Sequence, residues 1–243
     1  MPLPKIATPI YELEIPSLKK KIRYRPFLVK EEKILIIAME SEDSKQIANA
    51  VKTVISNCIL SKGIKIDDLA TFDIEYLFLN IRGKSVGETV DVLITCPDDN
   101  MTKVPVSINL DEISIQEQDG HNKDIKLDDT LTMRMKYPSM AEFIKNNFNN
   151  GEGIGVNESF DLICSCIDQV YSEEESWIGS ECSKKELSEF VEQLSSKQFK
   201  EIEKFFETMP KLSHNIQIKN PNTGVESEVV LEGLPAFSCK YGA

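Results

Sequence analysis

Several residue patterns in the sequence could carry chemistry, and each departs from the motif that it resembles. GKS at residues 83–85 has the form of the end of a phosphate-binding loop, but that motif needs an earlier glycine where the sequence has Phe78. GEGIG at residues 151–155 is similar to a dinucleotide fingerprint, but a valine stands at the position of the third glycine. Cys164 and Cys166 are separated by one residue, which is not the C-x-x-C spacing of zinc and redox sites. We therefore predict that the protein binds no metal, nucleotide or other cofactor.

Catalytic arrangements are equally hard to find. His121 and His214, the two histidines, have no neighbouring serine or cysteine in a nucleophile elbow such as G-x-S-x-G. Paired carboxylates such as Asp98 with Asp99 fall in predicted turns, where solvated aspartates are expected. The acidic segment 111–129 lacks the residue order of an EF-hand calcium loop, and we predict a solvated loop there. The sequence thus predicts no catalytic residue and no metal ligand, and an enzyme is the least favoured class.

Composition favours a protein that acts through protein partners. The chain has 243 residues, with 40 Asp and Glu against 28 Lys and Arg, so its formal net charge is −12. This charge argues against a nucleic-acid backbone as the main ligand. The six cysteines fit reduced thiols better than a disulfide framework. No stretch approaches the roughly 18 apolar residues of a membrane span, and the N-terminal segment has no apolar signal core, so we expect an intracellular protein.

A basic cluster near the N-terminus stands out in this acidic chain. Residues 9–26 predict a β-hairpin, because apolar and charged residues alternate on both sides of a PSLK turn. Ile22 and Tyr24 would occupy one face of the second strand, and the arginines of the cluster would occupy the other. We therefore predict that Arg23 and Arg25 form cross-strand pairs with Glu12 and Glu14.

The rest of the cluster is predicted to bind a partner. Lys19, Lys20 and Lys21 lie at or beside the predicted turn, where they would be exposed and free to contact an acidic protein surface. Leu234 and Phe237 are the other predicted partner contacts, in a C-terminal tail that has no secondary-structure signal.

The periodicity of the N-terminal part predicts helices and then strands. Apolar stripes predict one helix over residues 29–39, another that begins at Ser44 and is stopped by Gly63, and a third that Asp73 caps and Gly83 ends. Strict alternation then predicts a hairpin over residues 87–108 and a strand over residues 130–136.

The C-terminal part is predicted to be mainly helical. Serines with Glu or Gln three residues later predict helix starts at Ser139, Ser183 and Ser195. A further helix is predicted to carry Phe160, Ile163, Ile167 and Val170, and a final hairpin covers residues 213–231.

These elements predict an α+β fold with N-terminal β-hairpins and helices and a helix-rich C-terminal half that closes with a β-hairpin. The Asn- and Gly-rich stretch 146–159 is the best candidate hinge. It suggests an α+β part over 1–150 and a mainly helical part over 151–243, unless the chain forms one continuous domain.

Three stretches of the sequence resemble the baseplate protein family of T4-like contractile-tailed phages. They are the start MPLPKIATPIYELEIPSLKKKIRYRPFLVKEEKILIIAMES, the middle segment VDVLITCPDDNMTKVPVSINLDEI and the end IKNPNTGVESEVVLEGL. The most specific piece is RPFLVKEEKILI. The resemblance spans most of the chain, but after LEGL this sequence continues as PAFSCKYGA, which departs from the family pattern.

This resemblance implies a function without catalytic residues to carry over, because members of the family are baseplate hub subunits or hub assembly proteins. We expect a non-enzymatic structural component of the baseplate hub that contacts other hub or tail proteins, without nucleic acid or a membrane span, and self-association into a homo-oligomer stays open. It would be found in the host cytoplasm during assembly and then in the virion tail. The alternative is a hub assembly factor or chaperone that is absent from the mature virion.

Overall fold

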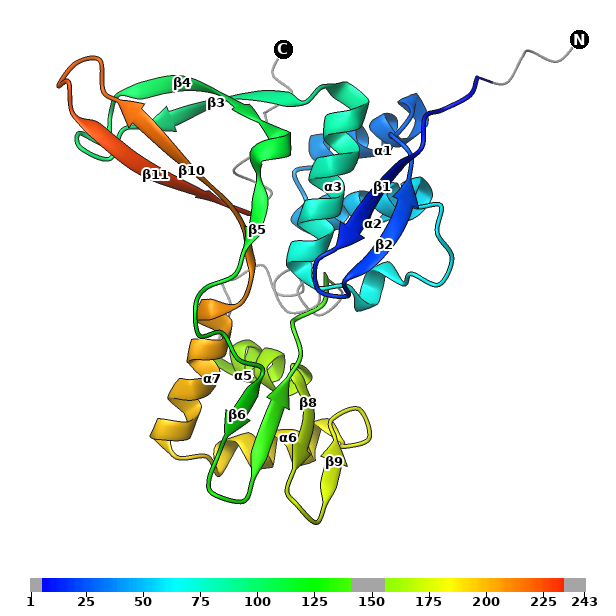
Figure 1. The fold of residues 1–243 in the computed structure, drawn as a ribbon, viewed down its shortest axis with the longest axis vertical. Helices are drawn as coiled ribbons and strands as arrows, with labels where there is room; N and C mark the ends of the chain where they lie inside the picture. The colour runs from blue at the N-terminus through cyan, green and yellow to red at the C-terminus, as the bar shows by residue number, and fades with distance from the viewer. Residues whose placement is uncertain (1–5, 141–155, 234–243) are drawn as a thin grey trace, which may run out of the picture. The chain divides into compact units, whose positions relative to one another are not determined.

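The computed structural model of the chain describes residues 6–140 and 156–233 (Figure 1). The chain forms two compact units that interleave along the sequence. Unit 1 takes its described residues from 1–66, 72–116 and 211–243, and unit 2 takes its described residues from 67–71 and 117–210. The predicted domain boundary at residues 150–151 lies outside the described residues. The α+β fold class is confirmed.

The N-terminal half of unit 1 is a hairpin packed on helices. β1 (Tyr11–Ile15) and β2 (Lys20–Tyr24) pair antiparallel as predicted, and Ile15, Ile22 and Tyr24 turn their side chains into the interior. Figure 1 shows this hairpin in front of α2 (Ser44–Cys58) and beside α3 (Thr71–Val86), with α1 (Val29–Glu40) nearby. The alternation of apolar and charged residues in the sequence therefore marks the inner and outer faces of the hairpin.

α2 begins at Ser44 as predicted but ends at Cys58, before the predicted stop at Gly63. The Asp43 carboxylate caps α2 by accepting the N–H groups of Lys45 at 2.8 Å and Gln46 at 3.3 Å. The predictions for α3 are wrong at both ends, because the helix begins at Thr71 and continues through Gly83 to Val86. Asp73 is buried in the first turn of α3 rather than at its cap.

The other half of unit 1 consists of strands. The predicted hairpins are confirmed as β3 (Thr89–Thr95) with β4 (Lys103–Asn109), and as β10 (Lys211–Lys219) with β11 (Glu226–Glu232). β5 (Ser114–Gln116) adds to β10, so the strand order is β11-β10-β5. A short 3₁₀ turn, η2 (Leu110–Glu112), precedes β5. The core of this part is made of Leu79, Val90, Ile94, Cys96, Ile108, Leu110, Ile113, Leu212, Ile216 and Ile218.

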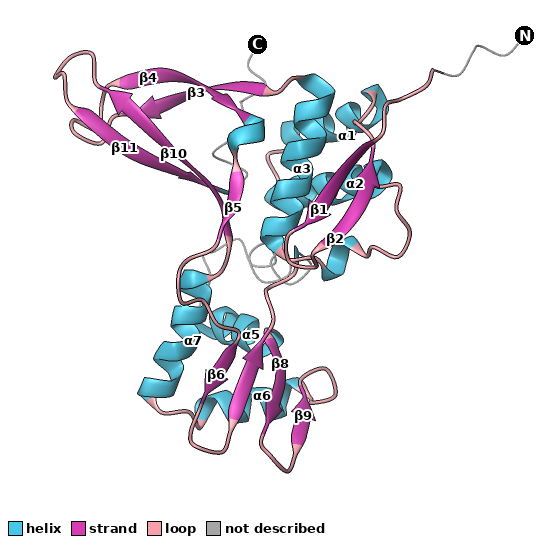
Figure 2. Cartoon of the chain, in the orientation of Figure 1, coloured by secondary structure: helices cyan, strands magenta, loops and turns pink. Residues whose placement is uncertain are grey.

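Unit 2 is a four-stranded antiparallel sheet with helices packed against it (Figure 2). The strand order is β6-β7-β8-β9, with β6 (Asp124–Lys126), β7 (Thr132–Met135), β8 (Ile167–Tyr171) and β9 (Ser176–Ile178). Among the described residues of unit 2, the helices are α5 (Val156–Ser165), α6 (Lys184–Glu192) and α7 (Ser196–Thr208). Ser183 and Ser195 form the predicted capping boxes of α6 and α7. η1 (Ile66–Asp68) lies where the chain passes between the units.

Two predictions for this region are wrong. Ile167 and Val170 lie in β8 and not in a helix, because α5 ends at Ser165 and both residues pair with methionines of β7. The segment 111–129 is not a continuous solvated loop, since it contributes η2, β5 and β6 and buries Ile113 and Ile125. Within residues 6–140 and 156–233, no helix is long and apolar enough to cross a membrane.

Candidate partner-binding surface

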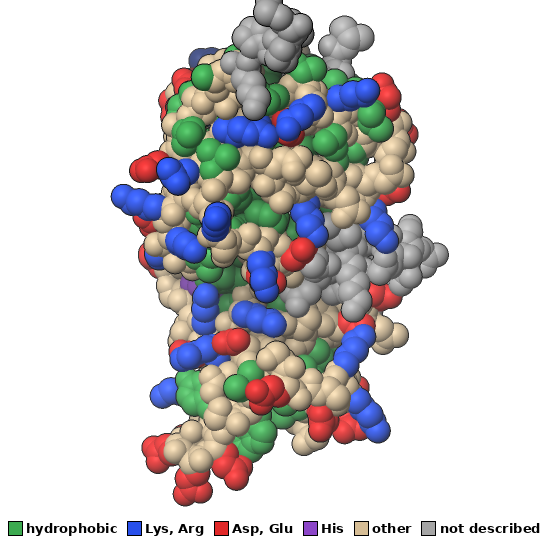
Figure 3. Space-filling model, turned by 90° about the vertical axis from the view of Figure 1, so that its right-hand side faces the viewer, with side chains coloured by type: hydrophobic (Ala, Val, Ile, Leu, Met, Phe, Trp, Pro, Cys, Tyr) green, Lys and Arg blue, Asp and Glu red, His purple; other side chains and the backbone are tan. Residues whose placement is uncertain are grey.

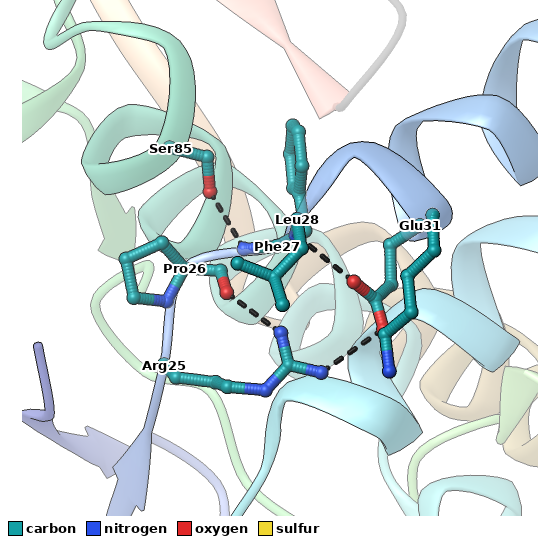
Figure 4. Close-up of polar contacts among 7 residues, drawn as sticks. Arg25, Pro26, Phe27, Leu28, Glu31 and Ser85 are labelled. Carbon is teal, nitrogen blue, oxygen red and sulfur yellow. Dashed lines mark hydrogen bonds and ion pairs between the residues drawn. The ribbon is translucent and has the colours of Figure 1, made fainter. Parts of the chain in front are cut away.

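The most specific part of the family-like sequence folds into a buried polar junction between β2 and α1 (Figure 4). Arg25 follows the last residue of β2, and its Nη1 donates to the carbonyl oxygen of Pro26 at 2.9 Å. Its Nη2 lies 2.9 Å from Oε1 of Glu31 in the first turn of α1. The side chain of Glu31 is fully buried and that of Arg25 is only 12% exposed, so this ion pair is shielded from water.

The same junction connects three elements of unit 1. The second oxygen of Glu31 accepts the backbone N–H of Leu28 at 2.9 Å, which satisfies a donor at the start of α1. The backbone N–H of Phe27 donates to the hydroxyl of Ser85 in α3 at 2.9 Å. The hairpin, α1 and α3 are thereby held in a fixed arrangement around residues 25–31.

The electrostatics of the junction indicate a structural role for its residues rather than a catalytic one. Burial by itself raises the pKa of Glu31. Hydrogen bonds from the Arg25 guanidinium and the Leu28 N–H together lower it by more than burial raises it, so the pKa lies below its ordinary value. Glu31 is therefore a carboxylate at neutral pH and cannot act as a proton donor there. Burial also raises the pKa of the nearby Cys58 thiol to about 11, which keeps it protonated and unreactive.

One of the predicted cross-strand pairs is wrong. Glu12 lies opposite Arg23 as predicted, but Glu14 lies opposite Lys21 and not opposite Arg25. Arg25 is beyond the end of β2, where the chain turns at Pro26 and leads the guanidinium toward α1.

The three predicted lysines are exposed on the hairpin, with Lys19 in the turn and Lys20 and Lys21 at the start of β2. Lys19 has a positive φ of 50°, which the tight reversal requires. The turn is anchored because the backbone N–H and hydroxyl of Ser17 both donate to the carboxylate of Asp73 in α3. In Figure 3, which views this side of unit 1, Lys and Arg side chains stand out from a mixed surface. The lysines are therefore displayed on a fixed support.

A second exposed surface was not predicted from the sequence. Val29, Ile36 and Ile37 are 80%, 40% and 55% exposed and share one side of α1, and we call them the α1 outer stripe. Leu35 and Ala38, on the opposite side of the helix, are buried. The signal in the sequence was the run ILIIAM at 34–39, six consecutive apolar residues, whereas a surface helix normally alternates apolar and polar sides.

The remaining candidates occupy structural positions or lie outside the described residues. Leu234, Phe237 and the GEGIG segment belong to the latter group. Cys164 and Cys166 are buried in the core of unit 2. His121 lies 3.0 Å from the Thr208 hydroxyl and 3.1 Å from the Tyr137 hydroxyl, and burial lowers its pKa.

Residues 6–140 and 156–233 contain no group of three or more His, Cys, Asp or Glu side chains that could hold a metal ion.

Comparison with known protein families gives a match over nearly the whole chain. A family model described as T4 bacteriophage base plate protein matches residues 8–237, a range that includes the buried junction, the lysines and the α1 outer stripe. No curated protein and no solved structure matches the chain.

Proposed function

The chain belongs to the T4 bacteriophage base plate protein family, and from this premise we propose that it is a non-enzymatic structural component of the hub region of a contractile tail baseplate. The resemblance noted in the sequence is confirmed for the family, whereas the hub location and the absence of catalysis are parts of the proposal. The observation that carries it is the extent of the family match, residues 8–237, because a match of this length includes both units and not a single shared module.

We infer that the α1 outer stripe is the apolar centre of a contact with another baseplate protein. Burying one aliphatic side chain of this kind is worth about 1.5–3 kcal/mol, so three neighbouring ones could dominate an interface. The buried Arg25–Glu31 junction supports this role because it fixes α1 at its first turn and so presents the stripe in one orientation.

Lys19, Lys20 and Lys21 would act differently in such a contact. Exposed charges add little to affinity but raise the rate of encounter with an oppositely charged surface, and salt weakens this effect. We therefore infer that the lysines steer an acidic protein surface to the hairpin. Leu234 and Phe237 stay predicted contacts on sequence grounds.

The alternative function, a hub assembly factor or chaperone, would use the same surfaces but leave before the virion is complete. Family membership supports a location in the virion tail, and synthesis and assembly in the host cytoplasm belong to the proposal. Quantitative mass spectrometry of purified virions separates the two functions.

We expect peptides from both units of the chain in purified virions, in a fixed ratio to other baseplate proteins. Peptides of an unrelated early phage protein, abundant in the lysate, serve as the control for carry-over. Presence of the chain in lysates and its absence from virions would contradict the structural role and favour the assembly factor.

A further inference from the structure

Unit 2 contains an apolar hollow of about 310 Å³ between the strands β8 and β9 and the helix α6. Its walls include Val170 of β8, Trp177 of β9, and Leu187 and Phe190 of α6. Trp177 is the single tryptophan of the chain and is 45% exposed, although large aromatic side chains are normally buried to a greater extent. The size is at the lower end of pockets that take ligands, which suits one or two aliphatic side chains better than a large cofactor.

The hollow is built into the fold of unit 2. Trp177 pairs with Val170 across β8 and β9, so the two side chains share the face of the sheet on which the hollow opens. β9 is the last strand of the sheet, and next to it the N–H of Gly179 donates to the carbonyl of Asp168 at 2.8 Å. A Cβ atom at Gly179 would lie 2.2 Å from the carbonyl oxygen of Ile167, so the close approach that shapes this edge requires glycine.

The surroundings of the hollow are acidic. Glu173, Glu174 and Glu175 form an exposed run immediately before β9, and Glu181 is exposed after it. The lysines nearest in sequence are already paired, because Lys184 contacts Asp161 and Lys185 contacts Glu189. An occupant of the hollow should therefore be an apolar side chain that is flanked by positive charges.

The chain itself displays such a segment on unit 1. Leu18 is 52% exposed in the β1–β2 turn and is followed by the exposed Lys19, Lys20 and Lys21. We propose that the turn of one copy inserts Leu18 into the Trp177 hollow of a second copy, with its lysines against Glu173, Glu174 and Glu175. This inference rests on the proposed function, in which the lysines bind an acidic protein surface. It identifies that surface as Glu173, Glu174 and Glu175 of a second copy.

The proposed contact joins different surfaces of the two copies. Such a contact either closes reciprocally, with each turn in the hollow of the other copy, or leaves one turn and one hollow free and continues into a ring or an open chain of copies. A baseplate built around a tail axis could accommodate the ring, but the contact itself is testable with the purified chain alone.

The test uses sedimentation velocity of the full-length chain over a range of micromolar concentrations at low and high salt. We expect association that increases with concentration and weakens with salt, together with a change in the emission of Trp177 as the hollow fills. Leu18→Ser should weaken association by about tenfold or more, as loss of a central anchor typically does.

Charge reversal makes the test specific. One variant carries Lys19→Glu, Lys20→Glu and Lys21→Glu, and the other carries Glu173→Lys, Glu174→Lys and Glu175→Lys. Each should be monomeric alone, and mixing them should restore association, because every turn then meets a hollow of opposite charge. The matched control is Glu201→Lys, Glu203→Lys and Glu207→Lys on α7, where three exposed glutamates change the net charge equally.

Three results would overturn the inference: a wild-type chain that stays monomeric at low salt, an association that neither reversal affects, or an association that leaves Trp177 emission unchanged. None of these results bears on the presence of the chain in virions. The mass spectrometry described above therefore tests the proposed function separately.

Discussion

The Arg25–Glu31 pair gives a physical meaning to the most specific segment of the family-like sequence. Each partner of this pair compensates the charge of the other, and Lys30 Nζ also lies 3.4 Å from the same buried Glu31 oxygen. Glu31 also holds the first turn of α1 through Leu28, so one carboxylate serves both the ion pair and the helix start. Arg25 and Glu31 of this segment therefore orient a surface helix without themselves contacting a partner, whereas Val29 between them belongs to the α1 outer stripe.

Replacement of Glu31 by Ala should be strongly destabilising. The variant leaves a poorly hydrated guanidinium without its partner and removes a helix-start hydrogen bond, so we expect a loss of about 3 kcal/mol in the free energy of unfolding. Urea unfolding followed by circular dichroism measures this quantity. Glu40→Ala, at an exposed position of the same helix, is the control and should cost less than about 0.5 kcal/mol. Equal losses for the two variants would contradict the role given to the pair.

The stability that Glu31 contributes should depend on pH in a defined direction. Its folded pKa lies below the ordinary value of 4.5, so the folded state favours the carboxylate more than the unfolded state does. The contribution is fully present above about pH 5 and is lost as the pH falls through the folded pKa. Unfolding of the wild type and Glu31→Gln should therefore differ most at neutral pH and converge in acid. A difference that is constant with pH would refute this assignment.

At the scale of elements, the basic residues of the β1–β2 turn and Arg25, just after β2, are expected to have different roles. The lysines serve recognition, and Arg25 serves stability. Lys19→Gln, Lys20→Gln and Lys21→Gln together should leave the melting temperature nearly unchanged, because exposed charges contribute under about 1 kcal/mol. Arg25→Gln should lower the melting temperature by several degrees, since its partner Glu31 is buried. Differential scanning calorimetry compares the two variants. A larger loss for the lysine variant would show that the lysines belong to the fold.

Two glycines in different elements should respond oppositely to alanine. Gly83→Ala in α3 places a Cβ 3.6 Å from Leu110, an ordinary contact, so it should stabilise the helix by about 0.5–1 kcal/mol. Gly179→Ala brings a Cβ within 2.2 Å of a backbone oxygen that has little room to move, so it should cost about 1–3 kcal/mol. Chemical unfolding of both variants checks the pair, and stabilisation by Gly179→Ala would be inconsistent with the packing at β9.

Elements with a strong period and a local signal could be predicted from the sequence. The hairpins of β1–β2, β3–β4 and β10–β11 and the capped starts of α6 and α7 are of this kind. β8 could not, because the i, i+3 spacing of Ile167 and Val170 favours a helix, and the strand becomes evident only in the pairing with β7, whose register shifts between Arg134 and Met135. The ion pair of Arg25 was not predicted for a similar reason, because its partner Glu31 lies in α1 and not in the hairpin.

At the scale of the whole molecule, the sequence did not reveal that unit 2 is inserted between segments of unit 1. β10 and β11 return to pair with β5, so residues far apart in the chain complete unit 1 around the inserted unit 2. No low-complexity linker marks these crossings in the sequence. Partner binding was predicted at the lysines but not at the α1 outer stripe, because the sequence alone does not show which apolar residues of α1 face the core and which face solvent.

The central claim is that the chain is built into the baseplate through the exposed face of α1. The most direct test is the copy number per virion of the Ile36→Asp, Ile37→Asp variant, measured by quantitative mass spectrometry in phage that lack the wild-type protein. Lys204→Asp, at an exposed position of α7 and outside the stripe, is the matched control because it changes the net charge by the same amount. Because Ile36 and Ile37 are exposed, the purified variant should keep the wild-type melting temperature while its copy number falls at least tenfold and that of the control stays near wild type. Incorporation of the folded double variant at the wild-type level would contradict the account.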